Sequence, residues 1–394
     1  MNPRDRPLKA SKSGQSQRRL SRYGCRNCKL RKVKCDEARP SCKGCRVFGV
    51  ICNFLHFNVP DLQSVQEMPG SSQEPVLIPP RALISNSIWA SNMVDCLNLD
   101  QHDQETFCRF RVRTVPSLGD SDFLSIYEDT ILKDSFTNPA LMHGLLAMAA
   151  AHDRYLGVRP AHNRSTRELA HSFQCTTSFS KSLREDIKEK QKDAIWATAV
   201  ILANLAFSSI NVSSYEEAWP IKPADPSDLQ WLRLKISDKA LWKIADPMRP
   251  NSAFRKMSTT LSDMLQIVPI RGIDGISPRL ADLCGLGSMS TPETNVFFAF
   301  AHALSRLLAI PKGKATLGEV FWALNNVSKE FYLCLERKDP VALLLLYLWY
   351  TRARGCRWWI DLRIEHELPA IKEYLQRHHG DIKSIQILLL GEEF

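Results

Sequence analysis

The sequence contains no long apolar run, and this absence excludes a membrane-spanning helix. Its longest run, Val341 to Tyr350, has ten residues, whereas a span needs about 18 to 20. The first residues lack the apolar core of a secretory signal, so we expect no secretion. No P-loop, Gly-x-Gly-x-x-Gly or Gly-x-Ser-x-Gly motif occurs. We therefore assign no catalytic residues and expect no enzyme.

Strand-like alternation and leucine heptads are also scarce. Apolar residues make up 44% of the 394 residues and charged residues 24%, as in folded globular proteins. From about residue 89 onward, apolar residues recur at helical spacing. The clearest helices are predicted from Pro139, over 195–206, over 297–308 with its start at 291–293, and over 341–349 with its start at Asp339-Pro340. The predicted fold class is mainly α, with residues 89–394 as one all-helical regulatory domain.

Acidic residues are rare at the N-terminal end of the sequence. Residues 1–57 hold fifteen Lys and Arg but only three acidic residues, a net charge of +12, which leaves −2 for the rest. A basic head on a near-neutral body indicates a polyanionic partner such as DNA, RNA or anionic lipid. We expect residues 1–22 to form a disordered basic arm. Residues 56–88, which contain five prolines, are predicted to form a flexible linker without a coiled coil.

Six of the twelve cysteines lie close together, in the predicted module 23–55. They are Cys25, Cys28, Cys35, Cys42, Cys45 and Cys52, which form two halves of the pattern Cys-x2-Cys-x6-Cys. Two four-coordinate zinc ions need eight sulfur–metal bonds, so six thiolates suffice only if two of them bridge both metals. The spacing therefore favours a cluster of two zinc ions per chain, in which metal binding and folding are one event.

Three other interpretations of these cysteines are weaker. A disulfide framework needs an oxidising compartment, for which there is no targeting signal. A metal-storage protein does not need Lys and Arg between its cysteines, and two separate zinc fingers need eight ligands. The remaining cysteines are expected to be reduced small hydrophobes; they are Cys96, Cys108, Cys175, Cys284, Cys334 and Cys356. His143, His152 and His171 lack a complete ligand set and are expected to be core or surface residues.

Residues 24–54, with all six cysteines, the basic run after Cys28 and Pro40 in the linking loop, resemble the fungal binuclear zinc-cluster (Zn(2)-C6) DNA-binding domain. The resemblance implies that Cys25 and Cys42 bridge the two metals. Cys28 and Cys35 would complete one zinc site, and Cys45 and Cys52 the other. It also implies a nuclear transcription regulator whose first short helix enters the major groove of double-stranded DNA at a CGG-like triplet.

The basic residues of the module then have different expected roles. The resemblance implies that Arg31 and Lys32 face the bases, and guanine presents two acceptors that Lys or Arg can contact. Phosphate contacts, which set affinity but not sequence preference, are expected from Arg26, Lys29, Lys34 and Lys43. The apolar side chains of Leu30, Val33 and Val47 are expected to support the cluster.

Segments of residues 90–390 resemble the regulatory domain of the sterol uptake control type of fungal regulators. The segments are His143 to Ala150, Trp219-Pro220 with 225–232, and 339–342 through 357–359. In that subfamily the helical domain can bind a lipid-like ligand, and relatives control sterol or secondary-metabolite genes. We further expect homodimer contacts from this domain. Two alternatives stay open: a cluster used for protein or RNA contact, and an enzyme domain anchored to chromatin.

Overall fold

The computed structural model describes residues 21, 23–39, 41–48, 50, 52–54, 87–89, 96–158 and 164–390. The chain divides into two compact units, residues 1–74 and 75–394. The predicted basic arm (1–22) and linker (56–88) lie almost entirely outside the described residues, as does Pro40. The module boundaries at 23–55 and at residue 89 therefore stay predictions.

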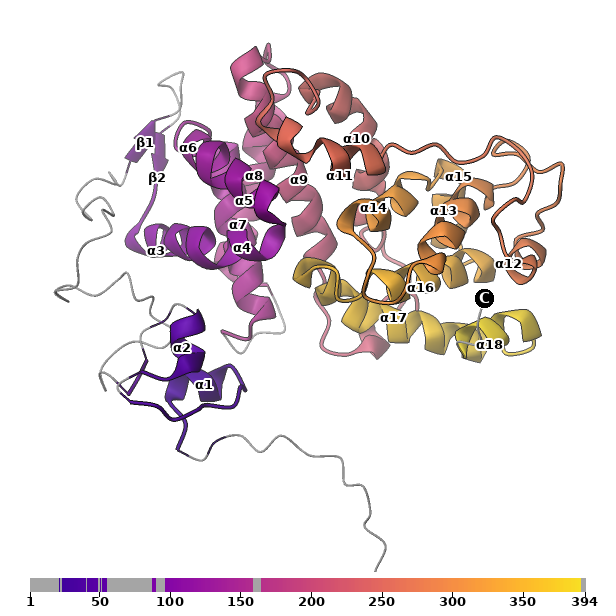
Figure 1. Cartoon of the computed structure of the whole chain (residues 1–394), viewed down its shortest axis with the longest axis horizontal. Coiled ribbons are helices and arrows are strands. Elements are labelled where there is room, and N and C mark those ends of the chain that lie inside the picture. Colours follow the sequence, from indigo (N-terminus) through magenta and orange to yellow (C-terminus); the bar gives the residue numbers. More distant parts are fainter. Residues whose placement is uncertain are drawn as a thin grey trace, which may run out of the picture. The chain divides into compact units, whose positions relative to one another are not determined.

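The first unit contains two short helices, α1 (Arg26–Leu30) and α2 (Lys43–Phe48) (Figure 1). Each begins directly after a cysteine and belongs to one half of the repeated cysteine pattern. Helices of this length are not stable in water by themselves. Their stability must therefore come from the groups around them.

The second unit is almost entirely helical, which confirms the mainly α fold class. Its short antiparallel hairpin, β1 (Ser87–Trp89) and β2 (Cys96–Asn98), pairs Ser87 with Asn98. The α-helices that follow are α3 (Gln101–Arg109), α4 (Val115–Leu118), α5 (Ser121–Ile126), α6 (Leu132–Asp134), α7 (Pro139–Tyr155), α8 (Thr166–Ser182), α9 (Lys192–Ser208), α10 (Gln230–Ala245), α11 (Ser258–Asp263), α12 (Pro278–Leu283), α13 (Phe298–Ala309), α14 (Leu317–Asn325), α15 (Lys329–Glu336), α16 (Pro340–Ala353), α17 (Trp358–His378) and α18 (Lys383–Leu389). Shorter turns of π-helix or 3₁₀-helix are η3 (Phe110–Thr114), η4 (Tyr127–Ile131), η5 (Glu189–Gln191), η6 (Tyr215–Glu217) and η7 (Ala253–Met257).

Local signals set the start of several helices. Asn138 caps α7 by accepting the Leu141 N–H, with Pro139 at the first helical position. Asp339 caps α16 in the same way, with Pro340 following it. Because proline needs no N–H partner at that position, both starts were predictable from sequence, and both are confirmed.

The predicted start of α13 is wrong. The segment 291–295 forms a turn, in which Thr291 O accepts the N–H groups of Thr294 and Asn295. Asn295 then accepts the Phe297 N–H through its side chain, and the helix begins at Phe298. The Asn295 amide also donates to Cys284 O, so a contact from another part of the chain places this turn.

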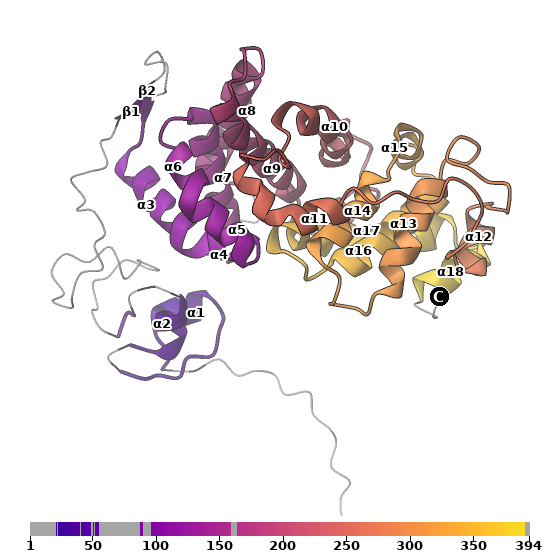
Figure 2. The ribbon, with the colours of Figure 1, turned by 45° about the horizontal axis from the view of Figure 1, so that its top comes forward.

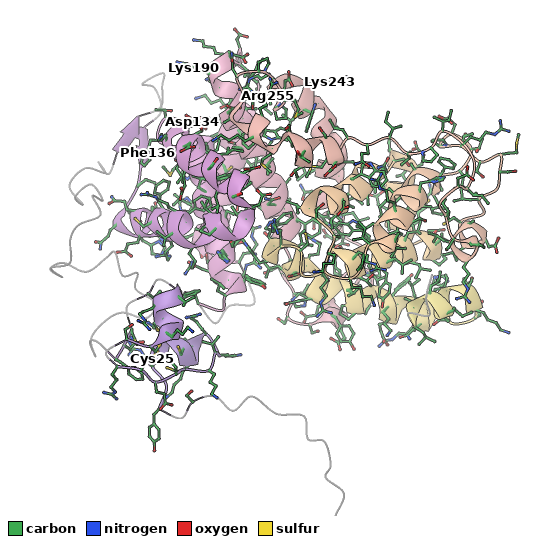
Figure 3. All side chains as sticks on the ribbon, viewed as in Figure 1. Cys25, Asp134, Phe136, Lys190, Lys243 and Arg255 are labelled. Atoms are coloured by element: carbon green, nitrogen blue, oxygen red, sulfur yellow. The ribbon has the colours of Figure 1, made fainter. Side chains whose placement is uncertain are left out.

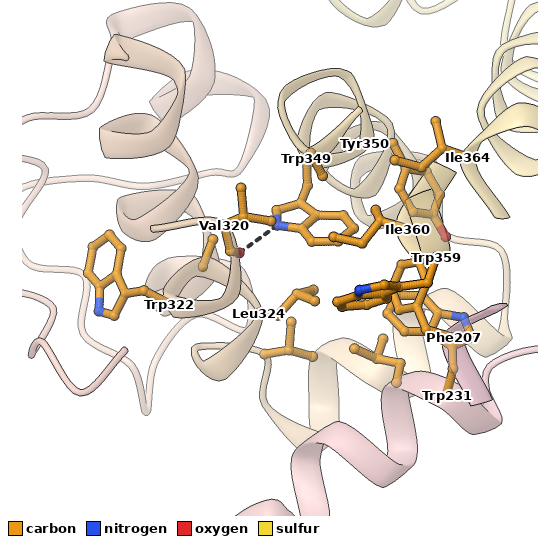
Figure 4. Close-up of a cluster of buried hydrophobic side chains, with 14 of the residues drawn as sticks. Phe207, Trp231, Val320, Trp322, Leu324, Trp349, Tyr350, Trp359, Ile360 and Ile364 are labelled. Atoms are coloured by element: carbon orange, nitrogen blue, oxygen red, sulfur yellow. Dashed lines mark hydrogen bonds between the residues drawn. The ribbon is translucent and has the colours of Figure 1, made fainter. Parts of the chain in front are cut away.

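The second unit has one large core, and α16 and α17 lie side by side within it (Figure 2). Aromatic side chains from α9, α10, α16 and α17 meet there (Figure 4). The Phe207 and Trp231 rings lie 4.5 Å apart, and Trp349 donates its indole N–H to Val320 O at 2.9 Å. Trp349 and Trp359 are buried. The aromatic side chains of 349–359 therefore belong to the core.

A buried charged pair crosses this core. Arg363 binds Glu367 and also donates to Phe207 O at 2.7 Å. Tyr350 donates its hydroxyl to the same carboxylate at 2.5 Å. Because every charged group here has a partner, the pair can be buried without an uncompensated charge. Burial still raises the pKa of Glu367.

In the second unit, two histidines contact each other, His143 of α7 and His171 of α8. His143 Nδ1 lies 2.9 Å from His171 Nδ1, and His171 Nε2 lies 3.2 Å from an Asp103 carboxylate oxygen. His152 is buried against the Trp358 ring, with its Nδ1 3.1 Å from the Thr114 hydroxyl. Burial lowers the pKa of His143 to about 4 and that of His152 to about 3. Both imidazoles are therefore neutral in the native state at neutral pH.

We expect the second unit to lose stability as the pH falls below 6.5. The unfolded chain protonates its histidines there, whereas the native state keeps His152 neutral. The unfolded state therefore binds more protons, and by pH 5 this costs about 1 to 2 kcal/mol for each such histidine. The free energy of unfolding at pH 7.5 and pH 5 measures this. All nine tryptophans lie beyond residue 88, so their fluorescence reports on this unit alone.

The substitution His152→Gln should flatten this pH dependence, and His378→Gln, at an exposed position, is the matched control. An unchanged pH dependence in the His152→Gln chain would contradict the assignment of this stability loss to His152.

Cys175 and Cys284 are buried free thiols as expected, whereas Cys108, Cys334 and Cys356 are half-buried. In the described part of the chain, no helix has the length and apolar character to cross a membrane.

Candidate metal centre and nucleic-acid interface

The six predicted metal ligands meet in the first unit, whose Cys25 is labelled in Figure 3. Their sulfur atoms form two sets of four, and within each set all four lie within 4.8 Å of one another. One set is Cys25, Cys28, Cys35 and Cys42, and the other is Cys25, Cys42, Cys45 and Cys52. Only Cys25 and Cys42 belong to both sets, which is the arrangement that two bridging thiolates require.

The distances between the sulfur atoms fit a metal cluster. Cys25 Sγ lies 3.7 Å from Cys42 Sγ and 3.5 Å from Cys45 Sγ, and Cys28 Sγ lies 3.6 Å from Cys42 Sγ. A disulfide bond is about 2.05 Å long, so these pairs are not disulfides. Tetrahedral zinc with bonds of about 2.3 Å places its sulfur ligands about 3.8 Å apart. The residues present therefore fit two zinc ions.

Burial opposes the ionisation of three thiols of this cluster, while at Cys35 and Cys52 hydrogen bonds outweigh burial and lower the pKa of the thiol. Burial raises the pKa of the Cys25 thiol to about 11, and it raises the pKa of Cys28 and Cys45 further. A buried thiolate is unfavourable without a nearby positive charge, whereas zinc binds the thiolate form. Metal binding supplies that charge, and folding and zinc binding of the module are therefore coupled.

The two halves of the cysteine repeat use the same local contacts. Cys28 N–H donates to Cys25 Sγ at 3.4 Å, and Cys45 N–H donates to Cys42 Sγ at 3.3 Å. The first cysteine of each half thus sits at the start of its helix and accepts a backbone hydrogen bond there. The Cys-x2-Cys spacing provides this geometry because the donor N–H lies three positions after the acceptor sulfur.

Two polar residues that sequence reasoning missed complete these helix starts. Asn53 Oδ1 accepts the Asn27 N–H of α1 at 2.8 Å, and Asp36 Oδ1 accepts the Lys43 N–H of α2 at 3.0 Å. Each of the two follows the last cysteine of one half. Asp36 and Asn53 occupy the same position in the two halves of the repeat, and this correspondence is the sequence signal that could have identified them. Each half therefore supplies a cap to the helix of the other half.

Arg31, predicted to face the bases, is held within the module. Its guanidinium lies 3.6 Å from the centre of the Phe48 ring, and its Nη1 donates to Gly44 O at 3.0 Å. Both contacts are with α2. Cation–π contact and hydrogen bond together connect the end of α1 to α2. This side chain is half-buried.

Lys32 differs from Arg31 in both backbone and exposure. Its φ is +52° and its side chain is exposed. The left-handed backbone ends α1, and Val33 N–H returns to Cys28 O at 3.0 Å, as in a Schellman helix end. Exposed side chains also extend from the predicted phosphate-contacting residues Arg26, Lys29, Lys34 and Lys43. The module thus presents exposed cationic side chains at both ends of α1, on the segment after it and at the start of α2.

The expectation for the apolar residues of the module is wrong. The side chains of Leu30, Val33 and Val47 are 41%, 37% and 80% exposed, so they do not support the cluster. Val50 is 4% exposed and is the buried aliphatic residue of the described module. The sulfur atoms themselves, all buried, take the place of a larger apolar core.

A further acidic group lies in the second unit, outside the cluster. Asp100, His102 and Asp103 have ligand atoms within 4.8 Å of one another. However, the Arg167 guanidinium already pairs with Asp100 at 2.7 Å and with Asp103 at 2.9 Å. A cation is thus already provided by the chain, and we assign no metal there.

Comparisons with known proteins agree with the geometry of the first unit. Residues 23–58 match the family described as the fungal Zn(2)-Cys(6) binuclear cluster domain. A Zn(2)-C6 fungal-type transcription factor, afumD of Aspergillus fumigatus, is 25% identical over 58% of this chain and 55% of its own length. Sterol uptake control protein 2 of Candida albicans is 35% identical over 19% of this chain and 11% of its own length.

A third relative covers more of the chain. A Zn(2)-C6 fungal-type transcription factor of Gibberella zeae is 23% identical over 86% of this chain and 79% of its own length. The chain spans only about half the length of the Aspergillus relative and about a tenth of the Candida relative. The ligand geometry and the family match lead to the same assignment. Residues 23–58 are a fungal Zn(2)-Cys(6) binuclear cluster domain, whose six cysteines bind two zinc ions.

Proposed function

We propose that this chain is a sequence-specific, DNA-binding transcription regulator of the nucleus that reads CGG-like triplets through its zinc cluster. The observation that carries the proposal is the exposed cationic run that ends α1, supported on a cluster with two bridging cysteines. Zinc stabilises the module, and the module presents the run. The names of the Aspergillus and Gibberella relatives support the same function.

Lys32 is the proposed base-reading residue. A lysine can donate to both acceptors of a guanine in the major groove, and the Lys32 side chain is exposed at the end of α1. Arg31 contacts Phe48 and Gly44 instead, so its proposed contribution to DNA reading is to hold α1 against α2. Phosphate contacts are proposed for Arg26, Lys29, Lys34 and Lys43, which set affinity and its salt dependence.

The helical unit is proposed to regulate the DNA-binding module. Homodimerisation through this unit would place two cluster modules on one DNA site. Control of sterol genes is supported by the name of the Candida relative, and secondary-metabolite genes are the other proposed targets. In the part of the chain that the structure describes, no arrangement of side chains favours an enzyme, and we propose none.

The experiment is selection from a random DNA pool by the full-length, zinc-loaded protein, with and without a chelator. We expect zinc-dependent enrichment of a CGG-like triplet. Two triplets at a fixed spacing would show a dimer, and one triplet a monomer. Equal binding of selected duplex, scrambled duplex and RNA would contradict DNA reading and favour the alternative of RNA or protein contact.

A further inference from the structure

A cavity of about 450 Å³ lies within the helical unit, where four segments distant in sequence meet. They are the turn between α4 and α5, the segment of η7 and α11, the turn before α14, and the turn between α16 and α17. Figure 2 shows α14 beside α16, with α17 next to it. A volume of this size accommodates a small organic molecule.

Three arginines line this cavity from the turn 352–357, which consists of the last residues of α16 and the residues before α17: Arg352, Arg354 and Arg357. Arg352 donates to Leu308 O at 2.7 Å and to Ile310 O at 2.9 Å, while its buried Nε has no acceptor. Arg357 donates to Leu118 O and Cys356 O. Within the described residues, no ion pair includes any of the three guanidinium groups. The acceptors of Arg352 and Arg357 are neutral carbonyls, whereas the charge of Arg354 acts on the Asp361 carboxylate of α17.

Among the residues that the structure describes, the two acidic residues of the lining form no ion pair with these arginines. Asp120 and Asp263 also line it, but Asp120 Oδ1 accepts the Phe123 N–H at 3.1 Å, and Asp263 Oδ1 accepts from Gln266 at 3.2 Å. A third carboxylate, Asp361, accepts the Gly355 N–H at 2.7 Å and offsets the charge of Arg354, so the positive charge available to a ligand is that of Arg352 and Arg357. Burial lowers the pKa of Arg352, because a desolvated cation without a counterion is unfavourable. An anion in the cavity would remove this cost.

The rest of the lining is apolar in part. Phe123, Met257 and Leu317 contribute hydrocarbon surface to the same cavity. Phosphate alone would leave this surface in contact with water. A ligand with an anionic group at one end and an apolar body uses both parts of the lining.

We propose that this cavity binds a small organic carboxylate with an apolar body, held by the arginines of the turn 352–357. The inference goes beyond the proposed DNA-reading function and does not depend on it, because every lining residue belongs to the helical unit. A ligand here would connect four segments of that unit and stabilise their arrangement. The cavity is therefore an effector site in the proposed regulatory domain.

The test uses the full-length, zinc-loaded protein and 4-phenylbutyrate as the probe, with 4-phenylbutan-1-ol and inorganic phosphate for comparison. Binding is measured by titration calorimetry and by the shift in thermal midpoint. We expect saturable binding of the carboxylate and at least tenfold weaker binding of both the alcohol and phosphate. Arg354→Gln should weaken the carboxylate at least fivefold. Arg354 is exposed, and its attraction to Asp361 of α17 is of the surface kind that contributes little to stability, so this variant should fold.

The matched control is Arg184→Gln, which removes the same charge from an exposed arginine outside the cavity. It should bind the probe as the unaltered chain does. Failure of 4-phenylbutyrate to bind, or binding unchanged by Arg354→Gln, would overturn the proposal. If the alcohol bound as tightly as 4-phenylbutyrate, the proposed role of the arginines would be overturned. If phosphate bound as tightly as 4-phenylbutyrate, the proposed role of the apolar surface would be overturned. DNA selection by the same samples separates these outcomes from failure of the proposed DNA function.

Discussion

Substitution of Cys42 by alanine should remove both zinc ions and unfold the cluster module. Cys42 belongs to both four-sulfur sets, so each metal loses a ligand at once. Zinc supplies about 10 kcal/mol per metal in small structural sites, and helices as short as α1 and α2 are not stable without it. Zinc content of the purified protein should fall from two ions per chain to fewer than one, with loss of all specific DNA binding.

The matched control is Cys284→Ala, at a buried cysteine of the helical unit. That chain should keep two zinc ions. Tryptophan fluorescence, which reports on residues beyond 88, should show that the helical unit stays folded in the Cys42→Ala chain. A folded Cys42→Ala module that retains two zinc ions would refute the bridging role.

Substitution of Lys32 by alanine should abolish triplet discrimination while both zinc ions stay bound. Lys32 is exposed and is not a metal ligand, so its removal leaves the cluster intact. A good contact from Lys to guanine is worth about 1 to 3 kcal/mol, or about 5- to 150-fold in the ratio of affinities for CGG and scrambled duplexes. That ratio, measured by competition at one salt concentration, is the test.

Two further variants separate base reading from other effects. Lys32→Gly also removes the side chain but suits the left-handed backbone at φ +52°, so it should lose discrimination equally. Lys43→Ala should weaken all sequences alike and reduce the salt dependence of binding, as expected for a phosphate contact. Preserved discrimination in both Lys32 variants would rule out Lys32 as the base-reading residue.

The metal centre could be predicted from the sequence because its information is local. Cysteines separated by two residues place a sulfur acceptor and a backbone donor together at a helix start. The repeat of this unit supplies six sulfur atoms for the eight sulfur–metal bonds of two zinc ions, so two of the sulfur atoms must bridge both ions. The starts of α7 and α16 were predictable for a similar reason, since Asn138 and Asp339 cap helices through neighbouring N–H groups.

The contacts of single side chains around the cluster were not predictable in this way. Arg31 and Lys32 are adjacent and equally basic, and sequence reasoning assigned them one role. The structure separates them: Arg31 contacts Phe48 from the other half of the repeat, whereas Lys32 is exposed. The exposed Val47 and the buried Val50 could not be distinguished by residue type either.

The sequence by itself thus determined the zinc ligands, the charge of the module and the helical character of the rest. These properties depend on spacing, composition and periodicity, which act over a few residues. The tertiary structure alone decided where α13 begins and that Arg31 contacts α2. It also decided that the turn 352–357 meets three other segments around a cavity. Each of these depends on contacts between residues far apart in the chain, and such contacts exist only once the core has packed.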